Sequence, residues 1–198
     1  MTFRGMWAGA LALGLAVAGP ALAQEDEKGR GDLNVFLRGG ISGYTGDLGG
    51  LTGTGPAWGV TVNVQPTNIL GFELAYDGSR NDVTDIRLVD DPSLYRHGAS
   101  GMLKIAPPFM EKVKPFVGAG LGVSYVAVRG LSAGLYEDDT MEEVPIAAGL
   151  EFNSGAVTAG FRTTYRVLVD EGFADNAQPG GDAGGDMLEA MFSLGGRF

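Results

Sequence analysis

Residues able to carry out acid–base or nucleophilic chemistry are few in this chain, and His97 is its only histidine. A histidine near a serine can act as base and nucleophile in ester hydrolysis, and Ser100 follows in His97-Gly98-Ala99-Ser100. On a strand, however, side chains three residues apart point to opposite faces. We therefore expect His97 to be a loop-edge residue beside Arg96, and no catalytic residue is predicted.

Two further patterns have a chemical interpretation that their surroundings do not favour. Asp90-Asp91 and His97 have the residue types of an acidic-pair protease, but a solvated loop charge cluster is the expected role. Gly118-x-Gly120-x-Gly122 begins like a dinucleotide-binding loop, but that motif needs a third glycine where Val123 stands, and a helix after it. No cofactor is therefore predicted.

Carboxylates gather in two polar segments, 129–143 and 168–186. Clustered carboxylates are ligands for hard divalent cations, so Ca²⁺ or Mg²⁺ are candidate partners at these acidic loops. The alternative is a solvated anionic surface that keeps the loops soluble. Neither segment has the ligand spacing of an EF-hand loop, and no metal site is predicted.

The first residues have the parts of a secretory signal peptide. Arg4 supplies the positive charge, 6–19 is an apolar stretch short for a membrane helix, and Ala21-Leu22-Ala23 is an A-x-A cleavage site. The sequence predicts three parts: a signal peptide at 1–23, a short periplasmic lead-in at 24–32, and a barrel domain at 33–198.

The composition excludes several classes of protein. The chain has no cysteine, which excludes a disulfide framework and a thiolate metal site. Its net charge of −10 argues against nucleic acid as a partner. Its 34 glycines have no collagen period and disfavour helices. An exported domain without disulfides needs another source of stability, which a closed hydrogen-bonded sheet supplies.

Alternation of apolar and polar residues recurs along 33–198 and predicts strands. Each segment has about the 9–11 residues that a tilted strand needs to cross a bilayer. Long connections alternate with shorter ones, as in membrane barrels with short periplasmic turns and longer external loops. We predict an all-β, eight-stranded antiparallel up-and-down transmembrane β-barrel, with strands at 33–43, 57–65, 69–78, 98–106, 115–128, 144–152, 156–167 and 187–198.

The two faces of these segments differ in charge. One face is apolar, as at Leu70, Phe72 and Leu74, and the other carries charges separated by glycines. A lipid-facing Arg or Lys near the midplane costs roughly 2–4 kcal/mol, so the charged face must point into the lumen. Buried charges should pair there. The predicted lumen ion-pair network is Arg38, Glu73, Lys104, Glu151, Arg162, Arg166 and Glu189.

Aromatic residues lie near both ends of the apolar band, as in the interfacial girdles of membrane barrels. The members near the long connections are Trp58, Tyr76, Tyr125 and Tyr165, and those near the short turns are Phe109, Phe152 and Phe198.

The final strand alternates and ends the sequence on an aromatic residue. Phe192, Leu194 and Phe198 share its apolar face and form the predicted assembly signal. We expect this strand to close the barrel against the first strand, near Val35 and Leu37.

Residues 112–125, a turn followed by a glycine-alternating strand, and the terminal strand resemble the small eight-stranded outer-membrane β-barrel proteins of Gram-negative bacteria, the OmpA/OmpX/OmpW-like group. The resemblance covers 33–198. It implies location in the cell outer membrane, contact with outer-membrane lipid and lipopolysaccharide, and insertion by the barrel-assembly machinery; a monomer is expected. Gly196 departs from the usual terminal signal, which has a second aromatic or apolar residue there.

These observations favour a structural or surface-interaction role with a lumen plugged by ion pairs, and no enzyme activity. Three alternatives stay open. One is a narrow pore or transporter for small molecules. Another is a lipid A-modifying enzyme, although the deacylases among such barrels resemble H-x-S-N, whereas Ser100 stands one residue further from His97. The third is a soluble barrel of lipocalin type, whose apolar face would line a cavity.

Overall fold

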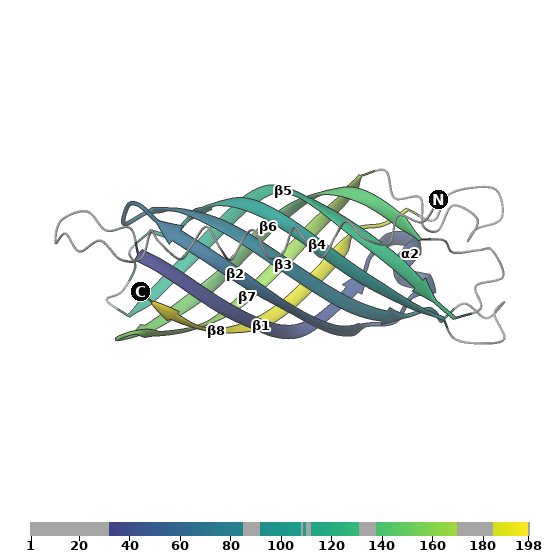
Figure 1. The fold of residues 1–198 in the computed structure, drawn as a ribbon, viewed down its shortest axis with the longest axis horizontal. Helices are drawn as coiled ribbons and strands as arrows, with labels where there is room; N and C mark the ends of the chain where they lie inside the picture. The colour runs from purple at the N-terminus through teal and green to yellow at the C-terminus, as the bar shows by residue number, and fades with distance from the viewer. Residues whose placement is uncertain are drawn as a thin grey trace, which may run out of the picture. The chain divides into compact units, whose positions relative to one another are not determined.

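The computed structural model describes residues 32–84, 92–107, 109, 112–130, 138–169 and 184–197. Its eight strands form a closed barrel in which each strand pairs antiparallel with the next along the chain (Figure 1). The strands are β1 (Asp32–Tyr44), β2 (Gly55–Gln65), β3 (Leu70–Asp82), β4 (Ser93–Ile105), β5 (Val113–Arg129), β6 (Asp139–Ser154), β7 (Val157–Val169) and β8 (Met187–Arg197). The predicted fold class is confirmed.

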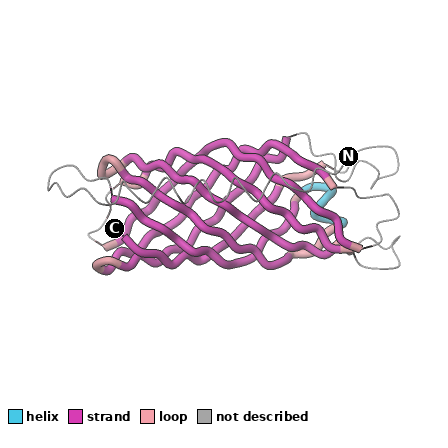
Figure 2. Tube along the Cα trace, in the orientation of Figure 1, coloured by secondary structure: helices cyan, strands magenta, loops and turns pink. Residues whose placement is uncertain are grey.

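Strand β8 closes the barrel against β1. Val35 lies opposite Gly196, and Leu37 lies opposite Leu194, as the sequence predicted. Almost all of the described chain outside the turns is strand (Figure 2). Among the described residues, no helix is long and apolar enough to cross a membrane.

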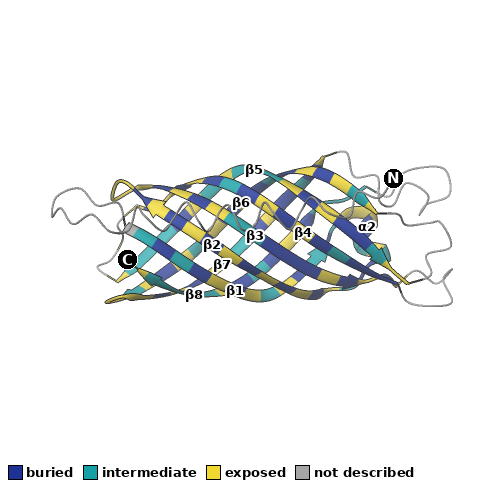
Figure 3. Cartoon of the chain, viewed as in Figure 1, coloured by how far each residue is buried: buried dark blue, intermediate teal, exposed yellow. Residues whose placement is uncertain are grey.

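The apolar face of the sheet points outward. Burial alternates strictly along β2, and buried and exposed positions alternate along the strands in Figure 3. Outward side chains such as Leu74 and Phe192 are 67% and 72% exposed. Ten charged residues of the strands are buried inside the barrel. This arrangement excludes the soluble lipocalin-type alternative, which requires the apolar face to line the cavity.

The two tight turns lie where the sequence predicted them. Between β6 and β7, Gly155 has a φ of 61°, a left-handed conformation that glycine adopts without steric cost. Between β2 and β3, the Thr67 hydroxyl accepts hydrogen bonds from the backbone N–H groups of Ile69 and Leu70, at 3.3 and 2.9 Å. The side chain therefore fixes the turn locally.

The strands extend further than predicted at the opposite end of the barrel. Strand β4 begins at Ser93 rather than at residue 98, and β6 begins at Asp139 rather than at 144. The added segments contain Arg96 and Glu143, whose polar character suggested connections. Both side chains are buried in the lumen, so here charge marks the inner face of a strand and not the start of a loop.

A six-residue helix, α2 (Gly46–Leu51), lies in the connection between β1 and β2, where no helix was predicted. Its sequence is glycine-rich and has low helix propensity, so contacts outside the helix must stabilise it. The Gly184 carbonyl accepts from the N–H of Asp47 at 3.0 Å, and the Leu51 carbonyl accepts from the N–H of Thr84 at 2.8 Å. We call the barrel end beside α2 the mouth.

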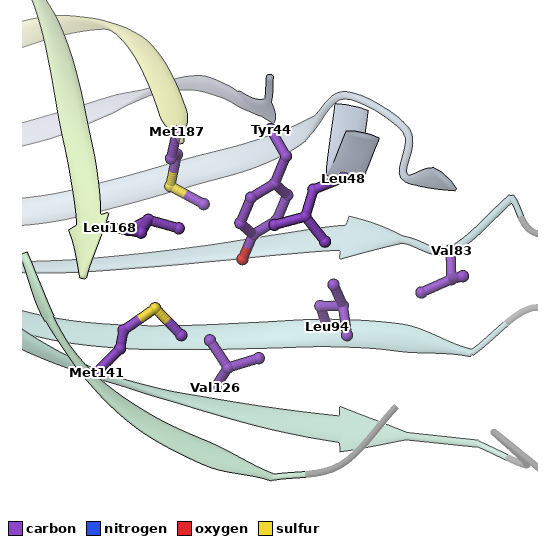
Figure 4. Packing of buried hydrophobic residues seen from close by; sticks show 8 residues of the cluster. All are labelled: Tyr44, Leu48, Val83, Leu94, Val126, Met141, Leu168 and Met187. Carbon is purple, nitrogen blue, oxygen red and sulfur yellow. The ribbon is translucent and has the colours of Figure 1, made fainter. Parts of the chain in front are cut away.

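An apolar cluster fills the barrel at the mouth (Figure 4). Leu48, the only buried residue of α2, is fully covered within this cluster. The mouth cluster consists of Tyr44, Leu48, Val83, Leu94, Val126, Met141, Leu168 and Met187.

Candidate functional site in the barrel lumen

Ten charged side chains are buried in the described part of the barrel, below the mouth cluster. Five are cations and five are carboxylates, so the lumen is electrically balanced. Ion pairs join them into two groups, which we call the upper and lower networks. The cations are Arg38, Arg96, Lys104, Arg162 and Arg166, and the carboxylates are Glu73, Asp77, Glu143, Glu151 and Glu189.

Arg166 on β7 is the centre of the upper network. Its guanidinium donates to Asp77 at 2.6 Å, to Glu143 at 2.6 Å and to Glu189 at 3.0 Å. Strands β3 and β7 are four positions apart in the eight-stranded order, so the contact from Arg166 to Asp77 spans the lumen.

Two further arginines complete the upper network. Arg38 pairs with Asp77. Arg96 pairs with Glu143 and also lies 3.6 Å from Glu189. Each carboxylate of this group therefore has two arginine neighbours, which offsets the desolvation cost of burying it.

The lower network again joins opposite walls. Arg162 on β7 donates to Glu73 on β3 at 2.6 Å. Lys104 lies 3.3 Å from Glu73 and also pairs with Glu151. The ring of Phe116 lies beneath both cations, with its centroid 4.5 Å from the Lys104 Nζ and 5.5 Å from the Arg162 guanidinium carbon, a cation–π arrangement.

Glycines on the inner face leave the space that the upper network occupies. A Cβ at Gly59 would lie 2.5 Å from the Asp77 carboxylate, and one at Gly98 would lie 2.6 Å from the Arg96 guanidinium. A larger residue at either position would displace a charged group. The glycine richness of the strands thus follows partly from the size of the side chains that cross the lumen.

The structure places all seven sequence-predicted network residues inside the barrel, each in at least one ion pair. Three members were missed: Asp77, Arg96 and Glu143. Asp77 lies four residues from Glu73 on β3. Arg96 lies eight residues from Lys104 on β4, and Glu143 lies eight residues from Glu151 on β6. Even spacing keeps them on the same face, so continuing the alternation beyond the predicted strand ends would have found Arg96 and Glu143.

His97 and Ser100 lie on opposite faces of β4. His97 is exposed on the outer wall, where its Nδ1 is 2.7 Å from the Tyr76 hydroxyl. Ser100 is 8% exposed and faces the lumen. His97 and Ser100 are therefore not a catalytic pair in this structure. Asp90 and Asp91 lie outside the described residues.

Tyrosines of the expected girdle at the mouth hold neighbouring polar groups against the outer wall. The Tyr125 hydroxyl donates to Asp138 at 2.7 Å. The Tyr165 hydroxyl donates to Asp186 at 2.5 Å. The strand ends at the mouth are therefore fixed by polar contacts on the outside as well as by the mouth cluster inside.

The predicted assembly signal is described only in part. Phe192 and Leu194 lie on the outer face of β8 and are 72% and 62% exposed. Phe198 lies outside the described residues, as do the predicted signal peptide at 1–23 and most of the two acidic segments.

The lumen networks are suited to filling space and neutralising charge. Each of the five lumen carboxylates has a cation within 4 Å, so their charges are compensated inside the barrel. Across the described ranges, no three histidine or acidic side chains are grouped so that they could hold a metal ion.

Comparison with known families agrees with this architecture. The sequence pattern of the family described as outer membrane protein beta-barrel domain matches residues 9–195.

Solved structures share the fold at low sequence identity. Neisserial surface protein A has a TM-score of 0.59 at 16% identity, covering 85% of this chain and 100% of that one. Ail, the attachment invasion locus protein of Yersinia pestis, in complex with the heparin analogue sucrose octasulfate, has a TM-score of 0.57 at 15% identity, covering 85% and 99%. OprG from Pseudomonas aeruginosa has a TM-score of 0.53 at 13% identity, covering 86% and 99%.

One curated protein shares a shorter stretch. A probable cytosol aminopeptidase of Allorhizobium ampelinum is 36% identical over 90 residues, which are 45% of this chain but only 17% of that protein. The overlap is too small a share of that protein to bring its activity to this chain.

Proposed function

The chain belongs to the outer membrane protein β-barrel family, and from this premise we propose that it serves as a closed outer-membrane barrel with a structural or surface-interaction role, not as an open pore or an enzyme. The observation that carries the proposal is the filled lumen. Two ion-pair networks cross it from β3 to β7, and the mouth cluster lies above them.

A solute could pass through the barrel only if both the ion-pair networks and the mouth cluster moved. Opening the upper network separates Arg166 from three carboxylates, and opening the mouth removes Leu48 from its apolar contacts. Both changes cost free energy, because the first leaves buried charges uncompensated and the second exposes apolar surface. This leaves the outer wall and the connections at the mouth as the surfaces through which the protein acts.

The same proposal includes the protein's route to the membrane and its partners. Residues 1–23 direct export, and the barrel-assembly machinery recognises the terminal strand through Phe192, Leu194 and Phe198. Outer-membrane lipid and lipopolysaccharide surround a single barrel, and divalent cations link the acidic connections to their phosphates. The family and the location are established, whereas these partners are proposed.

Planar-bilayer conductance tests the closed state. We expect the purified barrel to give no channel steps, and we expect the same of Arg80→Met, which removes contacts with Asp82, Ser93 and Tyr95 on the outer wall and none in the lumen. Stable channels in the unmodified protein would overturn the proposal. Channels that appear only in Arg38→Ala or Arg162→Ala would identify the networks as a gate and favour the narrow-pore alternative.

A cell-based assay tests the role in the envelope. Loss of the protein should increase sensitivity to detergent, and the unmodified barrel should restore resistance. A variant shortened within 172–182 should still restore detergent resistance if the role is structural. If the role is surface contact, the same variant should lose surface attachment and keep detergent resistance. No change in either property on deletion would refute both forms of the proposal.

A further inference from the structure

An open groove of about 550 Å³ lies on the outer wall of the barrel, in the half nearer the mouth. Its volume is within the roughly 300–1,000 Å³ of small-molecule sites. Outward side chains that line it are Leu74, Ala99, Leu121, Val123, Val144 and Val169. Gly101 on β4 contributes no side chain, which deepens the groove beside Leu121.

The groove lies beside a break in the pairing of β5 and β6, where Leu121 and Val144 line it. Paired residues run to Ala119 opposite Ile146 and resume at Gly122 opposite Glu143. The residue that would face Gly120 is Pro145, which has no N–H to donate to the ladder. The wall therefore lacks a hydrogen bond at the groove, and proline in a central strand is unusual.

Glu142 is the charged outward residue of the groove lining. It is exposed and lies in register between Val123 on β5 and Val169 on β7. Its carboxylate has no hydrogen-bond or ion-pair partner in the part of the chain that the structure describes. The second carboxylate of the lining, Glu143, points inward and is paired with Arg96.

An ionisable side chain on the lipid face costs free energy that a partner of opposite charge can recover. The register places Tyr125 diagonally across from Glu142 on the outer face, at the edge of the groove lining. Tyr125 is the next outward residue after Val123 on β5, and its hydroxyl is held by Asp138 at 2.7 Å. An aromatic ring and carboxylates together are the surroundings in which ammonium groups are bound.

We propose that this groove binds an amphiphile with one alkyl chain and an ammonium headgroup, the chain lying along the apolar lining and the ammonium pairing with Glu142. The ligand enters from the membrane plane, so the site operates whether or not the lumen conducts. It gives the outer wall a binding function beyond the proposed structural role.

Methyl NMR of the purified barrel in dodecyl maltoside micelles tests the proposal. The probes are dodecyltrimethylammonium and dodecanoate, which share a similar alkyl chain and differ in the sign of their charge. We expect the Val123 and Val144 methyl signals to shift at a concentration about fivefold to thirtyfold lower for the ammonium probe. The Leu194 methyl signals on β8 should respond equally to both. Equal responses at all three residues would overturn the proposal.

Three variants distinguish binding in the groove from attraction of the probe by surface charge alone. Glu142→Gln should abolish the preference for ammonium. Gly101→Leu should fill the groove and weaken binding of both probes, and its Cβ is tolerated because the nearest atom, a Leu74 methyl, lies at 3.6 Å. Gly39→Leu on β1 is the matched control, since nothing lies within 4 Å of its Cβ.

Each outcome decides the question once a heat-dependent gel shift shows that the variants are folded. If Glu142→Gln keeps the preference, the carboxylate does not recognise the headgroup. If Gly101→Leu binds ammonium as strongly as Gly39→Leu does, charge alone attracts the probe and no groove site exists. Either result refutes the proposal.

Discussion

Replacing Arg166 by methionine removes the central cation of the upper network. The variant leaves Glu189 with Arg96 alone, at 3.6 Å, and leaves Asp77 and Glu143 with one arginine each. Removing one partner of a buried ion pair costs about 3–5 kcal/mol, so we expect the free energy of unfolding to fall by about that amount.

The matched control is Arg80→Met on the outer wall. The side chains of Arg80 and Asp82 are 46% and 58% exposed and lie 3.0 Å apart. Exposed pairs contribute about 0–1 kcal/mol. The second comparison is with the double variant Arg166→Met/Glu189→Gln, which removes one charge of each sign. We expect a coupling of about 1–3 kcal/mol in favour of the double variant.

Equilibrium urea unfolding in phospholipid vesicles measures these differences. In a chain beginning at residue 24, Trp58 is the only tryptophan, and its fluorescence reports on the outer wall at β2. The gel shift on heating gives the folded fraction independently. If Arg166→Met costs no more than Arg80→Met, or if the double variant is strictly additive, the network does not stabilise the barrel as argued.

Three other changes test separate features. Leu48→Ala should lower the free energy of unfolding by about 2–5 kcal/mol, and Leu51→Ala, only partly buried beside the mouth cluster, by less; equal losses would contradict the role of the cluster. Gly155→Ala, at a φ of 61°, should cost about 1–2 kcal/mol, whereas Gly39→Ala should cost little. Deleting Phe198 should reduce the heat-shifted protein in membranes more than Phe198→Tyr does, and normal assembly of both would argue against a terminal signal.

The period-two alternation of apolar and polar residues predicted most of the fold. Alternation along 33–198 predicted eight strands, and the absence of charge on the strand face that carries Phe72 and Leu74 predicted which face meets lipid. The closing pair of β1 and β8 followed from the alternation of the last strand. Strand boundaries were less predictable, because the sequence pattern does not distinguish a charged residue in a connection from one on the inner face of a strand, such as Arg96.

The glycine-rich segment that forms α2 shows the limit of local inference. Its helix propensity is low, and the helix is stabilised by contacts with residues 84 and 184, far away in the sequence. Pro145 is a similar case. A proline predicts a weakened strand, but only the packed wall reveals that the weak point lies next to a groove that Glu142 lines.

The sequence by itself determined the eight strands, their two faces and seven of the ten charges that the lumen holds, because these depend on residue type and on a period of two. The tertiary structure alone decided that Arg166 reaches Asp77 across the barrel while Arg162 reaches Glu73. Partner choice depends on the register between strands and on which walls face each other, and both are set by closure of the whole sheet.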